Sequence, residues 1–189
     1  LKPNSVPFNI LLNATLKGDS TNKVQLATDV LSTMEKIGGD ARADVSSYNM
    51  VISALSRSSD KDAEQKALDY LRNMLKSYRE GYEKARPDSF VFNCLISMLS
   101  RSKQPWSDNV IYRTLMSMES QQKRGNASVI VDTITYNIVI GKLAKTPSKD
   151  NAKKVMNILK SMEEKSVTTD IITYTSVLKL QDIVNPGYA

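Results

Sequence analysis

An asparagine recurs along the chain in a constant setting, directly after an aromatic residue and eight residues before a cation. The four asparagines are Asn9, Asn49, Asn93 and Asn137, and the four cations are Lys17, Arg57, Arg101 and Lys145. An asparagine amide offers both a donor and an acceptor, which suits the edge of an unpaired base. One cation per repeat suits one phosphate per nucleotide. These residue types together indicate contact with a single-stranded nucleic acid, with the four cations as phosphate-contacting residues.

An aspartate stands four residues before three of these aromatic residues, at Asp44, Asp88 and Asp132, and Asp170 stands in the same place before Tyr174. A carboxylate at hydrogen-bond distance from an amide would fix the orientation of that amide. A simpler interpretation stays open. Each aspartate is then the cap of the helix that follows it, and each cation complements the dipole at a helix C-terminus.

The composition argues against catalysis. The chain has no histidine, which removes Ser-His-Asp and Cys-His arrangements, imidazole metal ligands and the commonest general base. Its single cysteine, Cys94, excludes an internal disulfide and every zinc site built from several cysteines. The sequence also has no glycine motif that cradles phosphates. We therefore expect no enzyme, no cofactor and no metal site.

The net charge of +6 and the pI of about 9.3 favour an anionic partner. Hydrophobic residues make up 41% of the chain, which is enough for a continuous core. No apolar run approaches the length of a membrane span. We expect a soluble protein that has no membrane partner.

The aromatic residue in each repeat begins a stripe with helical spacing. Its members are Tyr48, Val51, Ile52 and Leu55; Phe92, Leu95, Ile96 and Leu99; and Tyr136, Val139, Ile140 and Leu143. A methionine follows 25 residues after each asparagine and indicates a second helix, at Met34, Met74, Met118 and Met162. The repeating unit is therefore a pair of helices.

Successive aromatic positions lie 40, 44, 44 and 38 residues apart. Such periods are typical of solenoids, in which each helix pair buries its apolar face against its neighbours. The predicted fold is all-α, with residues 1–189 forming a single repeat array. Its units are 5–44, 45–88, 89–132 and 133–170, followed by a partial unit, 171–189, and preceded by residues 1–4 as the tail of another unit. In the fourth unit, Thr146 is expected to cap the second helix.

The chain resembles the pentatricopeptide repeat (PPR) proteins at three kinds of position. These are the helix opening Ile134-Thr135-Tyr136-Asn137, the methionine near the end of each second helix, and the closing pair Pro87-Asp88. The resemblance covers nearly the whole chain, although the units are longer than is usual in that family. It implies an α-α superhelix, a right-handed solenoid of helix-turn-helix repeats, in which each repeat reads one RNA base.

By this resemblance, each base is read by one side chain on the first helix and another at the end of the unit. The implied base-reading pairs are Asn9 with Asp44, Asn49 with Asp88, Asn93 with Asp132, and Asn137 with Asp170, and Thr175 takes the asparagine position in the partial unit. In the family, asparagine with aspartate implies uridine. The implied base-flanking residues are Val6, Phe90, Ile134 and Ile172, whereas Ser46 would flank a base poorly. The alternative for these positions is ordinary packing at the helix entry.

The expected function is therefore single-stranded RNA binding in organellar RNA metabolism, in processing, stability or translation. The expected RNA is U-rich, and the expected location is the mitochondrion or a plastid. Further partners would be other proteins of an organellar ribonucleoprotein. The alternative function is a protein-binding helical scaffold, such as a structural subunit of an organellar ribosome.

Overall fold

The computed structural model describes residues 4–18 and 20–184, and every regular element within these ranges is a helix. The α-helices are α1 (Ser5–Lys17), α2 (Lys23–Ile37), α3 (Val45–Ser56), α4 (Ala63–Arg79), α5 (Ser89–Arg101), α6 (Ser107–Lys123), α7 (Thr133–Lys145), α8 (Lys149–Glu164) and α9 (Ile171–Val184). Two short 3-10 helices, η1 (Gly39–Ala41) and η2 (Glu83–Ala85), follow α2 and α4. The prediction of an all-α fold is confirmed.

The chain divides into two compact units, Leu1–Leu95 and Ile96–Ala189, and the boundary falls within α5. Residues 1–3 of the predicted N-terminal tail and residues 185–189 of the partial repeat lie outside the described residues. In the part of the chain that is described, no helix combines the length and the apolar character that crossing a membrane requires.

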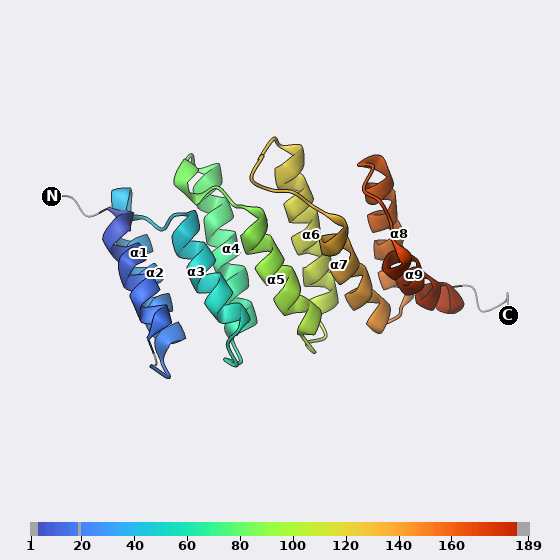
Figure 1. The fold of residues 1–189 in the computed structure, drawn as a ribbon, viewed down its shortest axis with the longest axis horizontal. Coiled ribbons are helices and arrows are strands. Elements are labelled where there is room, and N and C mark those ends of the chain that lie inside the picture. The colour runs from blue at the N-terminus through green and yellow to red at the C-terminus, as the bar shows by residue number, and fades with distance from the viewer. Residues whose placement is uncertain (1–3, 19, 185–189) are drawn as a thin grey trace. The chain divides into compact units, whose positions relative to one another are not determined.

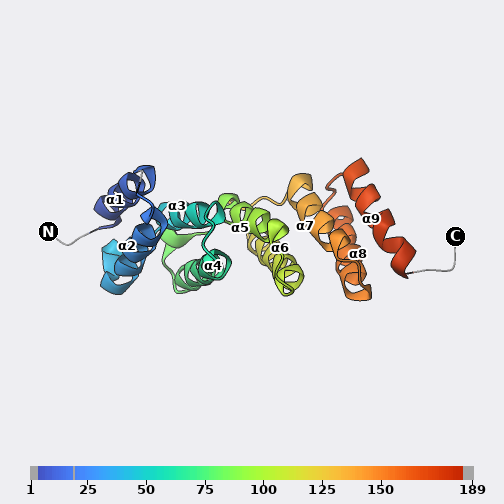
Figure 2. The ribbon, with the colours of Figure 1, turned by 90° about the horizontal axis from the view of Figure 1, so that it is seen from below.

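In the first compact unit the helices form two adjacent pairs. Helix α1 packs against α2, and α3 packs against α4. The pairs are joined because α3 also contacts both α1 and α2. Figure 2 shows α1 and α3 on one side of this unit, and α2 and α4 on the other. The first helices of two successive repeats therefore share one face.

The second compact unit repeats this arrangement. Helix α7 contacts α6 before it and α8 after it, and α9 then packs against both α7 and α8. The chain order of these helices can be followed by colour in Figure 1, from yellow at α6 to red at α9. Helix α9 thus takes the place relative to α7 and α8 that α3 takes relative to α1 and α2.

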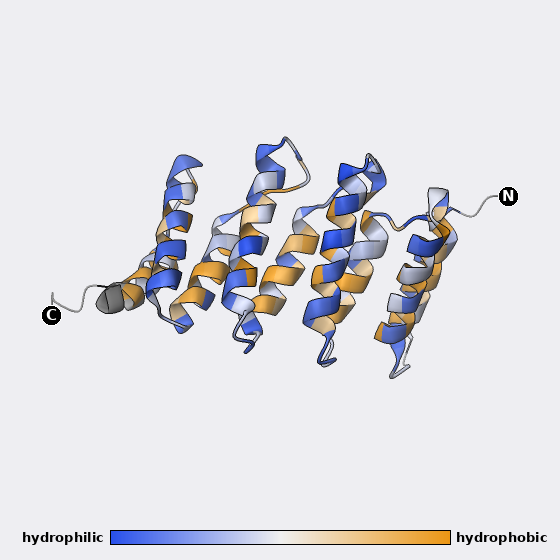
Figure 3. Cartoon of the chain, turned by 180° about the vertical axis from the view of Figure 1, so that it is seen from behind, coloured by the Kyte–Doolittle hydropathy of each residue, from blue (hydrophilic) through white to orange (hydrophobic). Residues whose placement is uncertain are grey.

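The core consists of the residues that the helical spacing predicts. All twelve members of the three predicted stripes, which begin at Tyr48, Phe92 and Tyr136, are fully buried. The four methionines of the second helices are fully buried as well. Burial of side chains of this size contributes roughly 1.5–3 kcal/mol each. Figure 3 shows α4 as largely hydrophilic, and its buried apolar residues, Ala63, Ala67, Leu71 and Met74, lie on one stripe.

The helix ends follow from local chemistry. Gly38 ends α2 with a φ of 66°, a left-handed backbone conformation that glycine adopts without a steric penalty. Helices α3, α5, α7 and α9 each begin at the residue after an aspartate, which is where the predicted repeats begin. One expected cap is wrong. Helix α8 begins at Lys149, and its cap is Ser148, whose Oγ accepts from the backbone N–H of Asn151 at 3.0 Å; Thr146 instead ends α7.

Candidate functional site

Three of the four predicted pairs of asparagine and aspartate are in direct contact. Asn9 Nδ2 donates to the two carboxylate oxygens of Asp44 at 3.1 and 3.0 Å. Asn137 Nδ2 donates to both oxygens of Asp170 at 3.0 and 2.9 Å. In the second repeat, Asn49 Nδ2 donates to Asp88 Oδ2 at 2.7 Å. Sequence separations of 33 to 39 residues place the two partners at opposite ends of one repeat, with the asparagine on its first helix and the aspartate at its last residue.

The fourth pair stays a prediction. Asn93 lies on α5 in the first compact unit, whereas Asp132 precedes α7 in the second. Asp132 is the N-cap of α7, and its Oδ1 accepts from the backbone N–H of Thr135 at 2.8 Å. Thr175, in the partial repeat, has its hydroxyl turned to its own helix, because Oγ1 donates to the carbonyl of Ile171 at 2.6 Å.

The carboxylate of each of these three aspartates is held in position by a hydrogen bond that caps the helix following it. Asp44 Oδ1 accepts from the backbone N–H of Ser47 at 3.0 Å, and Asp170 Oδ1 accepts from that of Thr173 at 2.9 Å. Asp88 Oδ1 accepts from the backbone N–H of Val91 at 3.1 Å. Such caps satisfy backbone donors that have no partner within the helix. Capping and the contact with asparagine therefore coexist, because one carboxylate serves both.

Hydrogen bonds hold the pKa of two of these carboxyls below the usual value. Burial raises the pKa of Asp44, but hydrogen bonds from the Ser47 backbone and from the side chains of Ser5, Ser47 and Asn9 together outweigh it. The pKa of Asp170 is lowered chiefly by the hydrogen bond from the Thr173 backbone. Both groups are therefore ionised, and can only accept hydrogen bonds, at neutral pH.

Lowering the pH below about 4 is expected to destabilise the wild-type protein more than an Asp44→Asn variant. The folded-state pKa of Asp44 lies below the unfolded value. Its contribution to the free energy of unfolding is therefore present above the unfolded pKa and is lost as pH falls through the folded pKa. The difference in Tm between the two proteins, followed by circular dichroism, should shrink across this range. If the Tm values of the two proteins fall in parallel as the pH is lowered, this role of the Asp44 carboxylate is contradicted.

One groove collects most of the residue types that the sequence singled out. It lies in the first compact unit and has a volume of about 640 Å³. We call it the Asn49 groove, and its lining residues are Asn13, Leu16, Lys17, Ser46, Asn49, Met50, Ser53, Arg57, Asp88 and Phe90. A base-reading pair, two base-flanking positions and two of the predicted cations thus face one space.

The four predicted base-flanking residues are exposed apolar side chains. Val6, Phe90, Ile134 and Ile172 are between 49% and 69% exposed. Exposure of this extent argues against ordinary packing at the helix entry, because a packed residue would be buried like the neighbouring stripe. Ser46 holds the same position in the second repeat and is also exposed, so that Phe90 is the apolar one of the two base-flanking positions in the Asn49 groove.

The four predicted cations are exposed and lie at or beside the ends of first helices. Lys17, Arg101 and Lys145 are the last residues of α1, α5 and α7, and Arg57 follows the last residue of α3. Arg57 is tethered one turn back, where Nη1 donates to Ser53 Oγ at 2.8 Å. Arg101 is tethered in the same way to Ser97 Oγ at 2.7 Å. A role beside the helix dipole is compatible with contact to a ligand, because these side chains reach solvent.

A second pocket, in the other compact unit, adds cations that the repeat pattern does not predict. We call it the Lys142 pocket. It has a volume of about 450 Å³ and is lined by Ser100, Arg101, Ser102, Lys103, Gln104, Pro105, Asp108, Lys142, Lys145 and Thr146. Lys142 is only 8% exposed, and its Nζ donates to the Ser102 carbonyl at 2.6 Å. Four cations and one carboxylate make the pocket strongly electropositive.

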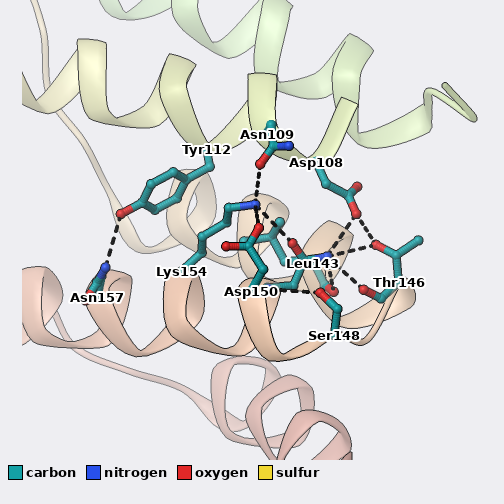
Figure 4. A network of polar contacts seen from close by, with 10 residues as sticks. Asp108, Asn109, Tyr112, Leu143, Thr146, Ser148, Asp150, Lys154 and Asn157 are labelled. Atoms are coloured by element: carbon teal, nitrogen blue, oxygen red, sulfur yellow. Dashed lines mark hydrogen bonds and ion pairs between the residues drawn. The ribbon is translucent and has the colours of Figure 1, made fainter. Parts of the chain in front are cut away.

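A polar network on α6 and α8 supports this pocket. Asp108 Oδ2 accepts from Thr146 Oγ1 and, at 2.9 Å, from Asn151 Nδ2, while Asp108 Oδ1 lies 3.6 Å from Lys142 Nζ. Figure 4 shows Asp108 directed toward Thr146, and Lys154 of α8 directed toward Asn109 of α6. The contacts hold the start of α8 against α6.

Ser47 and Thr173 also belong to the site, and the sequence reasoning missed them. Ser47 Oγ donates to Asn9 Oδ1 at 2.6 Å, and Thr173 Oγ1 donates to Asn137 Oδ1 at 2.6 Å. The available signal was a hydroxyl residue that recurs three residues after most of the repeat aspartates. Within residues 4–18 and 20–184, no group of three or more His, Cys, Asp or Glu side chains is placed to hold a metal ion.

Comparison of the chain with protein-family models and with curated proteins gives no match.

Proposed function

We propose that this protein binds single-stranded RNA through PPR-like repeats that form a right-handed superhelix, with one base per repeat and a preference for uridine. The observation that supports the proposal best is the Asn49 groove, which gathers an amide, a carboxylate, an aromatic ring and two cations around one space. By the resemblance to PPR proteins, the RNA is U-rich and the protein acts in the mitochondrion or a plastid. Its role is binding rather than catalysis.

A base entering the Asn49 groove lies between the Ser46 and Phe90 positions. The Phe90 ring is 49% exposed and offers a face for stacking. Stacking of a base on an aromatic side chain contributes about 1–3 kcal/mol and does not depend on base identity. Phe90 therefore supplies affinity, and the choice between bases falls to Asn49.

The orientation of the asparagine amide decides which base it matches. An ionised aspartate only accepts hydrogen bonds, so it draws the Nδ2 end of the amide toward itself, as in the 2.7 Å contact between Asn49 and Asp88. The opposite orientation would bring two acceptors together. Uracil presents an N3–H donor, whereas cytosine presents an N3 acceptor and an amino donor. An amide fixed in one orientation can therefore distinguish the two pyrimidines.

The cations complete the site by contacting the RNA backbone. Lys17 and Arg57 line the Asn49 groove, and Arg101 and Lys145 line the Lys142 pocket. In each compact unit, two of the repeat cations thus face the same space. Two neighbouring cations can contact two successive phosphates of one RNA strand. In the Lys142 pocket, Lys103 and Lys142 add to the positive charge.

Asp44→Asn is expected to change base preference at one nucleotide position. The substitution keeps an N-cap of equal quality. It also adds a donor that faces Asn9, so that the amide of Asn9 is held less firmly in one orientation. Preference at that position should move from uridine toward cytidine by about 1 kcal/mol, near the low end for a bidentate base contact.

The measurement is binding at low salt to a U-rich oligonucleotide and to a set in which each uridine in turn is replaced by cytidine. Asp40→Asn is the matched control, because Asp40 is an exposed carboxylate close by in the chain. The wild type and the control should favour uridine at every contacted position. An Asp44→Asn variant that weakens binding to every oligonucleotide equally would show that Asp44 is only a helix cap. Absence of RNA binding by the wild type would refute the proposed function.

A further inference from the structure

A third residue contacts the base-reading amide in two of the repeats. It stands three residues after the aspartate, at Ser47 in one repeat and Thr173 in another. Ser47 Oγ lies 2.6 Å from Asn9 Oδ1, and Thr173 Oγ1 lies 2.6 Å from Asn137 Oδ1. The same distance in separate parts of the chain indicates a shared arrangement.

The hydroxyl proton has one favoured acceptor in this arrangement. Ser47 Oγ accepts from the backbone N–H of Asp44 at 3.3 Å, which leaves its single proton to donate. Two acceptors are within reach, Asn9 Oδ1 at 2.6 Å and Asp44 Oδ1 at 3.0 Å. The shorter contact directs the proton to the amide oxygen.

The asparagine amide is therefore held at both ends. The carboxylate accepts from Nδ2, and the hydroxyl donates to Oδ1. Thr173, Asp170 and Asn137 repeat these contacts, including the 3.3 Å hydrogen bond from the Asp170 backbone N–H to Thr173 Oγ1. Reversal of such an amide would break one hydrogen bond and would place its oxygen against a carboxylate.

The second repeat lacks this contact. Val91 stands three residues after Asp88, and it has no hydroxyl to donate. Among the residues that the structure describes, the buried Asn49 Oδ1 has no hydrogen-bond partner, whereas Nδ2 keeps its 2.7 Å contact with Asp88. The Asn49 amide is therefore held at one end only. A buried acceptor without a partner carries an energetic cost that a donor at position 91 would remove.

We propose that the residue three positions after each repeat aspartate is a third specificity-determining position. A serine or threonine there fixes the amide orientation and sharpens the choice of uridine over cytidine, and Val91 makes the second repeat the less selective one. This inference rests on the proposed function, because it concerns the same base-reading site. Its residues act on the base through the asparagine, so they are positioning residues.

The test introduces the missing hydroxyl with Val91→Thr and compares it with Val51→Thr, since both valines are fully buried in the same compact unit. A buried hydroxyl without a partner destabilises a core. Val51→Thr should therefore lower the Tm, whereas Val91→Thr should keep or raise it, because Asn49 Oδ1 accepts the new proton. Equal losses of Tm in both variants would overturn the inference without any use of RNA.

The second measurement uses the oligonucleotides with single cytidine replacements. Val91→Thr should raise discrimination of uridine over cytidine at one position by about fivefold, the equivalent of one hydrogen bond of about 1 kcal/mol. Ser47→Ala should lower it by a similar factor at a different position. A stable Val91→Thr protein that binds uridine-rich RNA with unchanged discrimination would refute the inference and leave the proposed function standing. A wild type that binds no RNA would refute both.

Discussion

Replacement of Lys17 and Arg57 together by glutamine is expected to weaken binding of U-rich single-stranded RNA by about 25-fold at 0.1 M salt. Each phosphate contact on a single strand contributes roughly 0.7 to the slope of log K against log salt, and therefore about fivefold in affinity at that salt concentration. Four such contacts give the wild type a slope of about −3, and loss of two halves it. Titrations at several salt concentrations measure the affinity and the slope together.

The control is a variant that loses the same charge elsewhere. Arg72 and Lys76 lie on α4, with side chains 71% and 69% exposed, and neither lines the Asn49 groove. Their replacement by glutamine lowers the net charge equally, so it reports the general electrostatic effect. A similar loss of affinity in both double variants would mean that RNA is held by net charge alone. An unchanged slope in the Lys17 and Arg57 variant would mean that these cations do not contact phosphates and only complement the dipoles of their helices.

The helices and the core could be predicted from the sequence because both follow from local spacing. A stripe such as Tyr48, Val51, Ile52 and Leu55 lies on one face of any α-helix, and that face is fully buried. The repeat boundaries could be predicted for a related reason, since each aspartate caps a helix by accepting from a backbone N–H only a few residues away. Thr146 shows the limit of this reasoning. Thr146 and Ser148 both have side chains that can cap a helix, but the Thr146 hydroxyl donates to Asp108 and Ser148 is the cap.

Contacts between successive repeats were harder to predict, because they join residues that are far apart in the sequence. The bond between Ser47 and Asn9 joins residues 38 apart, and the bond between Lys142 and Ser102 joins residues 40 apart. Ser47 belongs to a recurring position, which a comparison of the repeats could have revealed. Lys142 does not recur, because Ala14, Ala54 and Met98 stand at the corresponding places. Its buried amino group could be located only once α7 and Ser102 were placed in space.

Asp108→Ala is expected to lower the free energy of unfolding by about 3 kcal/mol, the lower end for removal of one partner from a buried ion pair. Lys142 is 8% exposed, and its hydrogen bond to the Ser102 carbonyl does not neutralise the charge that Asp108 now balances. Asn151 and Thr146 would also lose an acceptor. The corresponding fall in Tm is about 6–12 °C for a chain of this size.

Glu164→Ala is the matched control, because it also removes one carboxylate from the second compact unit, and the ion pair of Glu164 with Lys160 on α8 joins two side chains that are 65% and 76% exposed. Such pairs contribute at most about 1 kcal/mol. Lys142→Met in the Asp108→Ala background tests the cause, because it removes the uncompensated charge and should restore part of the lost stability. If the double variant is as unstable as Asp108→Ala, the loss comes from the start of α8, where Asn151 and Thr146 lie, and Lys142 is not held in place by Asp108.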